Sequence, residues 1–184
     1  MLLNAYETIK PFLNTYQEQL TGSQIAKQQN LNQKTVANHL TVLEEQGILA
    51  STTQGRNKLY QFNNNYKPSV RLFILAAEHI KTLHFYQSYP IIKEIAEKIR
   101  PHINGSAILF GSYAKGIPKK HSDIDLLIIG SCQEQQIERV AKTYQKEINL
   151  KIYPTFEYDT LTKEAIAHHV YLKGAEEVVD KVLV

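Results

Sequence analysis

Two carboxylates stand close together at the start of an apolar run in the second half of the chain. Asp123 and Asp125 flank Ile124, and four aliphatic residues follow at 126–129. Alternate residues of a β-strand point to the same face, so a strand here would direct both carboxylates the same way. Two anions this close repel each other unless a cation lies between them. Mg²⁺ takes hard oxygen ligands, commonly one or two carboxylates plus phosphate oxygens. The pair therefore predicts a magnesium site, with Mn²⁺ as the alternative metal.

A glycine–serine pair precedes these carboxylates. Gly111 and Ser112 follow an apolar segment, at 106–110, where a strand is expected to turn into a short helix. Glycine lets a phosphate approach the backbone closely, and free N–H groups at such a turn bind anions. Lys115, in the same loop, could add positive charge. Together these residues predict a site for a metal-bound nucleoside triphosphate. A purely structural acid pair at a strand end is the alternative.

The elements around this site are expected to alternate along the chain. The sequence predicts strands at 106–111, 122–130 and 147–153, and helices at 90–103, 133–146 and 160–174. The tail from residue 175 could form a helix or an edge strand. Strands that alternate with helices indicate a small α/β domain. His168 and His169 would lie about 100° apart on the last helix, which disfavours a shared ligand role.

The first third of the chain has a different organisation. Thr21 or Ser23 could cap a short helix, and Asn32 could cap a second one over about 33–46. Gly47 is placed to end that second helix. The segment 48–62 then predicts two short strands around a hairpin turn at 54–57. This order of helix, turn, helix and basic hairpin is typical of a helix-turn-helix with a wing.

The segments "IAKQQNLNQKTVANHLTVLEEQGIL" and "GRNKLYQF" resemble the winged helix-turn-helix domains of bacterial and archaeal transcription regulators. The resemblance implies that the second helix enters the major groove of double-stranded DNA and that the wing touches the backbone. The DNA-binding side chains expected from it are Gln33, Lys34, Thr35, Asn38, His39, Arg56 and Lys58. Gln and Asn can read adenine edges, while Lys and Arg neutralise phosphates. A winged helix used only for protein contacts is the alternative.

The second half resembles a minimal nucleotidyltransferase of the DNA polymerase β superfamily. The motif is Gly111-Ser112, ten intervening residues, and then Asp123-Ile124-Asp125. The resemblance implies that Asp123 and Asp125 hold one or two magnesium ions, while Gly111 and Ser112 bind the triphosphate. The implied reaction is in-line transfer of a nucleotidyl group, with AMP as the expected group, to a hydroxyl. Antitoxin-type members suggest a partner protein as acceptor.

One position departs from that family pattern. The family usually places a third carboxylate on the next strand, where it completes the metal site. Here the polar face of the segment 147–153 carries Glu147, Asn149, Lys151 and Tyr153. Either Glu147 serves as the third catalytic carboxylate, or the domain binds nucleotide as a sensor without turnover. A small-molecule nucleotidyltransferase of the antibiotic-modifying sort is a third, less favoured interpretation.

The segment "NNNYKPS" at 63–69 predicts a domain boundary. The expected organisation is an α+β protein, with a winged helix-turn-helix at 1–68, a connecting helix at 69–88 and a nucleotidyltransferase domain with a mixed sheet at 89–184. The helix at 70–87 is apolar on more than one side, and the predicted stripe runs through Leu72, Leu75, Ala76, Ile80 and Leu83. Its second partner could be another copy of the chain, in a homodimer, or the chain's other domain.

The overall composition limits the classes of partner, metal site and cellular location that the sequence allows. The net charge of +3 permits a nucleic-acid partner but does not demand one. The single cysteine, Cys132, excludes an internal disulfide and a thiolate zinc cage. No stretch approaches the roughly 18 apolar residues of a membrane span. These features predict a cytoplasmic regulator that does not contact a membrane.

Overall fold

The computed structural model describes residues 2–183. The chain forms two compact units, one ending at Ile80 and the other running from Lys81 to Val182. The division falls inside the helix α4 (Lys67–Ser88), in the part of the chain where the sequence predicts a connecting helix at 69–88. Within the described residues, no helix is both long and apolar enough to cross a membrane.

The helices of the first unit begin and end at the expected signals. α1 (Leu2–Ile9) passes into a 3₁₀ turn (Lys10–Leu13) that contains Pro11. Thr21 caps α2 (Gly22–Gln28) in a capping box with Gln24, and the Asn32 side chain caps α3 (Gln33–Glu45). Val36, Leu40 and Leu43 bury one face of α3, as its three- and four-residue spacing predicts.

A three-stranded antiparallel sheet completes the winged helix-turn-helix. Its strands are β1 (Leu20–Thr21), β2 (Leu49–Gln54) and β3 (Asn57–Phe62), in the order β1-β3-β2. Gly55 and Arg56 form the two-residue turn of the wing, where Gly55 adopts a φ of +62°. The predicted wing is therefore confirmed. A short 3₁₀ helix (Asn64–Tyr66) leads from β3 into α4.

The buried side of α4 differs from the predicted stripe. Val70, Ile74 and Ala77 are buried in the first unit, and Phe85 is buried in the second. Leu72 and Leu83 of the predicted apolar stripe are 66% and 61% exposed in the single chain. A helix with apolar residues around most of its circumference offers several candidate faces, and tertiary packing selects among them.

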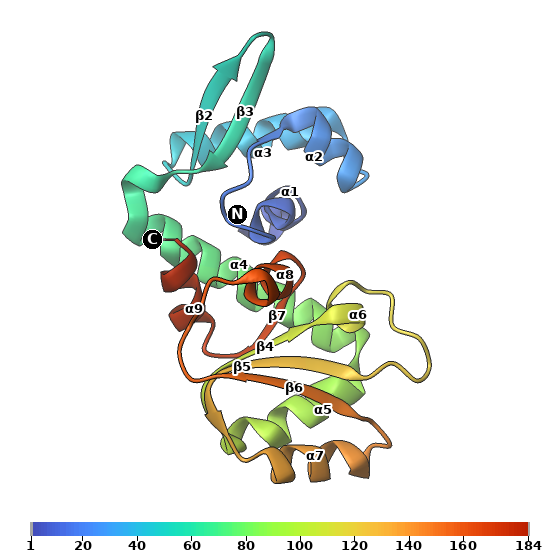
Figure 1. The fold of residues 1–184 in the computed structure, drawn as a ribbon. Coiled ribbons are helices and arrows are strands. Elements are labelled where there is room, and N and C mark those ends of the chain that lie inside the picture. Colours follow the sequence, from blue (N-terminus) through green and yellow to red (C-terminus); the bar gives the residue numbers. More distant parts are fainter. Residues whose placement is uncertain (1, 184) are drawn as a thin grey trace. The chain divides into compact units, whose positions relative to one another are not determined.

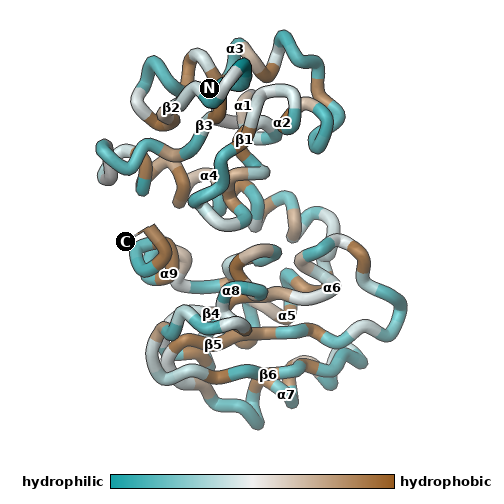
Figure 2. Tube along the Cα trace, turned by 45° about the horizontal axis from the view of Figure 1, so that its top comes forward, coloured by the Kyte–Doolittle hydropathy of each residue, from teal (hydrophilic) through white to brown (hydrophobic). Residues whose placement is uncertain are grey.

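The second unit is built on a mixed four-stranded sheet. Its strands are β4 (Ile103–Phe110), β5 (Ile124–Cys132), β6 (Ile148–Tyr153) and β7 (Val170–Lys173), in the order β6-β5-β4-β7. Only the β5–β6 pair is parallel. β5 is strongly hydrophobic along most of its length (Figure 2), as expected for a central strand covered on both faces.

Helices cover the two faces of this sheet (Figure 1). α5 (Pro90–Ile99), a following 3₁₀ turn (Arg100–His102) and α7 (Glu134–Thr143) lie on one side. α8 (Thr160–Ala167) and α9 (Ala175–Val182) contact β4 from the other. The short helix α6 (Gly111–Ala114) follows β4 directly and leads into the loop before β5.

The predicted helix at 160–174 is too long. α8 ends at Ala167, and residues 170–173 form β7, which pairs with β4. The run Val170-Tyr171-Leu172 is rich in residues that favour strands, and the open edge of β4 provides a partner for it. His169 is buried with its ring 4.4 Å from that of Tyr171, whereas His168 is exposed.

Candidate functional site

The turn at Gly111 lies directly against the carboxylate of Asp125. The last residue of β4, Phe110, pairs with Asp125 in the antiparallel register. Gly111 follows with a φ of +70°, and a Cβ atom built on it would lie 2.1 Å from Asp125 Oδ2. Only glycine satisfies both the backbone conformation and the close approach. Gly111 and Asp125 are 14 positions apart in the chain, and the fold therefore brings them into direct contact.

Asp125 lies at the start of β5, and Asp123 directly precedes that strand. Ile124, between them, is buried in the core formed with α5 and α7. Asp123 is exposed, and Asp125 is half-buried beside the Gly111 turn. The shared face of the two carboxylates, predicted from strand alternation, remains a prediction, because β5 begins only at Ile124.

Asn149 holds Asp125 from the neighbouring strand. The parallel register pairs Asp125 of β5 with Asn149 of β6. Asn149 Nδ2 donates a hydrogen bond to Asp125 Oδ1 over 3.2 Å. The Gly111 turn therefore lies against Asp125 Oδ2, and the Asn149 amide donates to Oδ1. These two contacts limit the rotation of the Asp125 carboxylate.

Glu147 lies beside Asp123 rather than beside Asp125. Its carbonyl oxygen accepts a hydrogen bond from Ile124 N over 2.9 Å, just before β6 begins. An open pocket of about 320 Å³ is lined by Asp123 and Glu147 together with Lys120, His121, Ser122, Gln145 and Lys146. Among residues 2–183, no three Asp, Glu, His or Cys side chains gather in a way that could hold a metal ion.

The loop between α6 and β5 carries the basic residues. Lys115 lies 3.8 Å from Glu164 Oε1 of α8, so part of its charge is already compensated. Lys146 Nζ donates a weak hydrogen bond to the carbonyl of Lys120 over 3.4 Å, at the rim of the pocket. Ser112 is partly exposed at the first turn of α6. The predicted nucleotide-binding residues Gly111, Ser112 and Lys115 therefore lie in one continuous segment next to Asp125.

The side chains present fit a hard divalent cation. Asp125 at the start of β5 and Asp123 just before it could supply carboxylate oxygens, and phosphate oxygens of a nucleotide are the customary further ligands of Mg²⁺. The Gly111 turn leaves the backbone beside Asp125 without a side chain in the way. Asp123 and Asp125 are the residues that would hold the metal.

The exposed side of α3 carries most of the predicted DNA-binding residues. Gln33, Lys34, Thr35 and Asn38 are all exposed. His39 differs, because its ring is partly buried and Nδ1 lies 2.9 Å from Thr8 Oγ1 of α1. Arg56 is exposed in the turn of the wing. Together these residues place amide and basic groups on α3 and at the wing tip.

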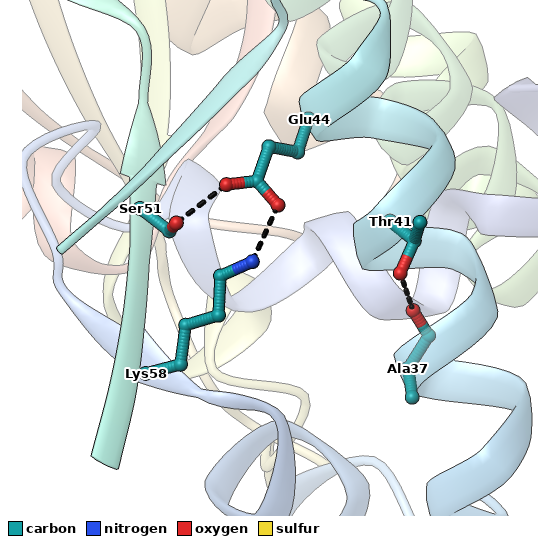
Figure 3. A network of polar contacts seen from close by, with 5 residues as sticks. All are labelled: Ala37, Thr41, Glu44, Ser51 and Lys58. Atoms are coloured by element: carbon teal, nitrogen blue, oxygen red, sulfur yellow. Dashed lines mark hydrogen bonds and ion pairs between the residues drawn. The ribbon is translucent and has the colours of Figure 1, made fainter. Parts of the chain in front are cut away.

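Lys58 of the wing is engaged with α3, as Figure 3 shows. Its Nζ lies 2.7 Å from Glu44 Oε2, and Ser51 Oγ donates to Glu44 Oε1 over 2.5 Å. The hydrogen bond from Lys58 lowers the pKa of Glu44, and the same bond raises the pKa of Lys58. The sequence does not reveal the partner of Glu44, because Lys58 is 14 residues away on another element. Lys58 is thus less available to a phosphate than its exposure suggests.

Comparison with known proteins assigns both units. Residues 90–179 match the family of nucleotidyltransferase domains, and residues 12–51 match the arsR family of bacterial regulatory proteins. The chain joins a helix-turn-helix domain to a nucleotidyltransferase domain. No curated protein is significantly similar in sequence to the whole chain.

Two solved structures are similar to the chain. The first is a crystal structure of a toxin-antitoxin with AMP-PNP, with 18% identity and a TM-score of 0.42 over 50% of this chain and 79% of that one. The second is TrmBL2, an archaeal chromatin protein, with 14% identity and a TM-score of 0.28 over 83% of this chain and 62% of that one. This chain thus spans less than two thirds of TrmBL2. At these identities and TM-scores, neither likeness supports an inference about function.

Proposed function

We propose that this protein is a DNA-binding regulator whose nucleotidyltransferase domain binds a magnesium-bound nucleoside triphosphate and transfers its nucleotidyl group to a hydroxyl. AMP is the expected group, and a hydroxyl on a partner protein is the expected acceptor. The observation that supports the proposal is the packing of the Gly111 turn against Asp125, two positions after Asp123 in the chain. We propose that a phosphate binds at this turn and that a divalent cation binds next to it.

The chain's own residues have separate tasks in this proposal. Gly111 and Ser112 bind the triphosphate, and Lys115 adds positive charge nearby. When bound between Asp123 and Asp125, magnesium would neutralise phosphate charge and polarise the α-phosphate. The acceptor oxygen forms a bond to the α-phosphorus while the bond to the α–β bridging oxygen breaks, and pyrophosphate leaves. In this proposal Glu147, which lines a pocket together with Asp123, accepts the hydroxyl proton.

Asn149 favours a second candidate function. An amide, not a carboxylate, is paired with Asp125, and it donates a hydrogen bond to it. Such a site can bind a nucleotide without turning it over at a useful rate. In that case the domain would act as a nucleotide sensor, and occupancy would change the affinity of the other domain for DNA.

Transfer of label from α-³²P-labelled ATP, CTP, GTP or UTP, with magnesium and native lysate, tests the proposal. We expect one nucleotide to label a protein band, and the Asp123→Asn/Asp125→Asn double variant to lose the label. Glu147→Gln should slow labelling on the order of 10²-fold if Glu147 accepts the proton. Equal labelling by the double variant would contradict the proposal. Saturable nucleotide binding that never yields label, but alters DNA affinity, would support the sensor instead.

A further inference from the structure

The second domain has another pocket, at a distance from the proposed nucleotide site. Its volume is about 350 Å³, which lies in the range of small-molecule binding sites. Ser106 of β4 and Ile129 of β5 both line it, and they are paired with each other in the sheet. The pair formed by Phe110 and Asp125 lies four residues further along β4, which corresponds to about 13 Å. The pocket is therefore separate from the Gly111 turn.

Apolar side chains form part of the wall of this pocket. Ile129 contributes from β5, Val178 from α9, and Phe156 from the loop that follows β6. The Phe156 ring stacks with that of Tyr158, with the ring centres 6.2 Å apart and the planes at 22°. Lys163 Nζ of α8 lies 5.0 Å from the centre of the Tyr158 ring. These contacts hold the aromatic part of the wall in place for an apolar group of a ligand.

Glu177 of α9 brings a carboxylate to the same pocket. Ser106 Oγ lies 2.6 Å from Glu177 Oε2 and 3.0 Å from the carbonyl oxygen of Gly174. A hydroxyl has one proton, so Ser106 can donate fully to only one of these two acceptors. Within residues 2–183, Glu177 Oε1 has no hydrogen-bond donor. Ser106 thus orients the Glu177 carboxylate and leaves it able to accept hydrogen bonds from a ligand.

Lys181 brings a positive charge next to this carboxylate. It lies four positions after Glu177 on α9 and lines the same pocket. Side chains four positions apart on a helix have Cβ atoms about 5–6 Å apart. Both side chains are exposed, and no ion pair joins them in the described part of the chain. The pocket therefore presents one anion and one cation beside an apolar wall.

We propose that this pocket binds a free α-amino acid with an apolar side chain. The ammonium group of the amino acid donates to Glu177, its carboxylate pairs with Lys181, and its side chain packs against the wall at Phe156. A ligand with a single charge would leave one of the two protein charges without a partner, so the charge pattern favours a zwitterion. The inference does not depend on nucleotide transfer, because the two sites share no residue.

Titration of L-phenylalanine into the ¹⁵N-labelled full-length protein, followed by NMR, tests this inference. We expect saturable amide shifts at the residues that line the pocket, with a Kd on the order of 1 mM or lower for a ligand of this size. Glycine lacks the apolar side chain, N-acetyl-L-phenylalanine lacks the ammonium and L-phenylalaninamide lacks the carboxylate. Each should bind at least about tenfold more weakly, because each loses one of the three proposed interactions.

Glu177→Gln and Glu176→Gln form a matched pair of variants. Both remove one negative charge from an exposed position in the first turn of α9, but only Glu177 lines the pocket. We expect Glu177→Gln to weaken L-phenylalanine binding at least about tenfold, because it loses a charge-assisted hydrogen bond. Glu176→Gln should stay within about twofold of the wild type, since salt screens an exposed charge outside the site. Lys181→Gln should weaken binding about tenfold as well.

Three results would overturn the inference. The first is the absence of shifts at the pocket up to the solubility limit of L-phenylalanine. The second is equal weakening by Glu176→Gln and Glu177→Gln, which would reveal a general charge effect. The third is undiminished binding of both N-acetyl-L-phenylalanine and L-phenylalaninamide, which would show that the pocket takes apolar groups in general, such as a peptide segment. The same spectra show whether each variant is folded.

Discussion

At the scale of single residues, the ion pair between Glu44 and Lys58 limits how the wing can meet DNA. Lys58 donates to Glu44 over 2.7 Å and lies 5.0 Å from the centre of the Tyr60 ring. An exposed ion pair of this kind adds little stability, but it gives the lysine a competing partner. A DNA phosphate must displace Glu44 before it can bind Lys58. Glu44 therefore reduces the contribution of Lys58 to the electrostatic attraction between the wing and DNA.

The substitution Glu44→Gln should strengthen DNA binding by releasing Lys58. One additional phosphate contact makes the slope of log K against log salt steeper by about 0.9 for duplex DNA. Glu45→Gln is the matched control, because it removes the same charge from an exposed neighbouring position of α3. Fluorescence anisotropy with duplex DNA at several salt concentrations measures both. Equal slopes for the two variants would show that Lys58 is already free to bind phosphate.

At the scale of elements, the β4–α6 turn is the feature on which the proposed nucleotide site depends. Gly111→Ala should both strain the backbone and displace Asp125, because the new Cβ would lie 2.1 Å from Oδ2. Gly116→Ala is a matched control, since Gly116 has a φ of +72° but open space around its Cβ position. Each variant should lose about 1–2 kcal/mol of unfolding free energy from the left-handed backbone conformation.

Nucleotide binding distinguishes these two glycine variants. We expect Gly111→Ala to lose ATP binding by at least about tenfold, which is about 1.4 kcal/mol. Gly116→Ala should bind ATP as the wild type does. Urea unfolding and calorimetry supply the two measurements. If both variants bound ATP equally well, the contact between Gly111 and Asp125 would have no part in binding.

Local signals predicted most of the elements, and long-range pairing explains the exceptions. The caps at Thr21 and Asn32 and the wing turn at Gly55 are set by nearby residues, so the sequence revealed them. β7 was missed because its strand character depends on the open edge of β4, more than 60 residues earlier. The hydrogen bond between Asn149 and Asp125 likewise depends on the parallel register of β5 and β6. Spacing along the chain cannot reveal such contacts.

At the scale of the whole molecule, a helix-turn-helix domain and a nucleotidyltransferase domain share one chain, so the two proposed binding functions can be coupled. The helix-turn-helix and nucleotidyltransferase domains are joined through α4, which contributes residues to both compact units. If nucleotide binding changes the affinity for DNA by some factor, DNA must change the affinity for nucleotide by the same factor. This reciprocity would hold for a sensor and for a slow transferase. The homodimer expected from the sequence remains a prediction.

Both functions proposed for the second domain require a divalent cation, which we propose is held by Asp123 and Asp125 beside the Gly111 turn. Calorimetric titration of ATP into the wild type and the Asp123→Asn/Asp125→Asn variant, with magnesium and again with EDTA, tests this claim most directly. The account predicts saturable binding by the wild type with magnesium, and at least a tenfold loss (about 1.4 kcal/mol) with EDTA or in the folded double variant. Undiminished ATP binding by the double variant, or by the wild type in EDTA, would contradict it.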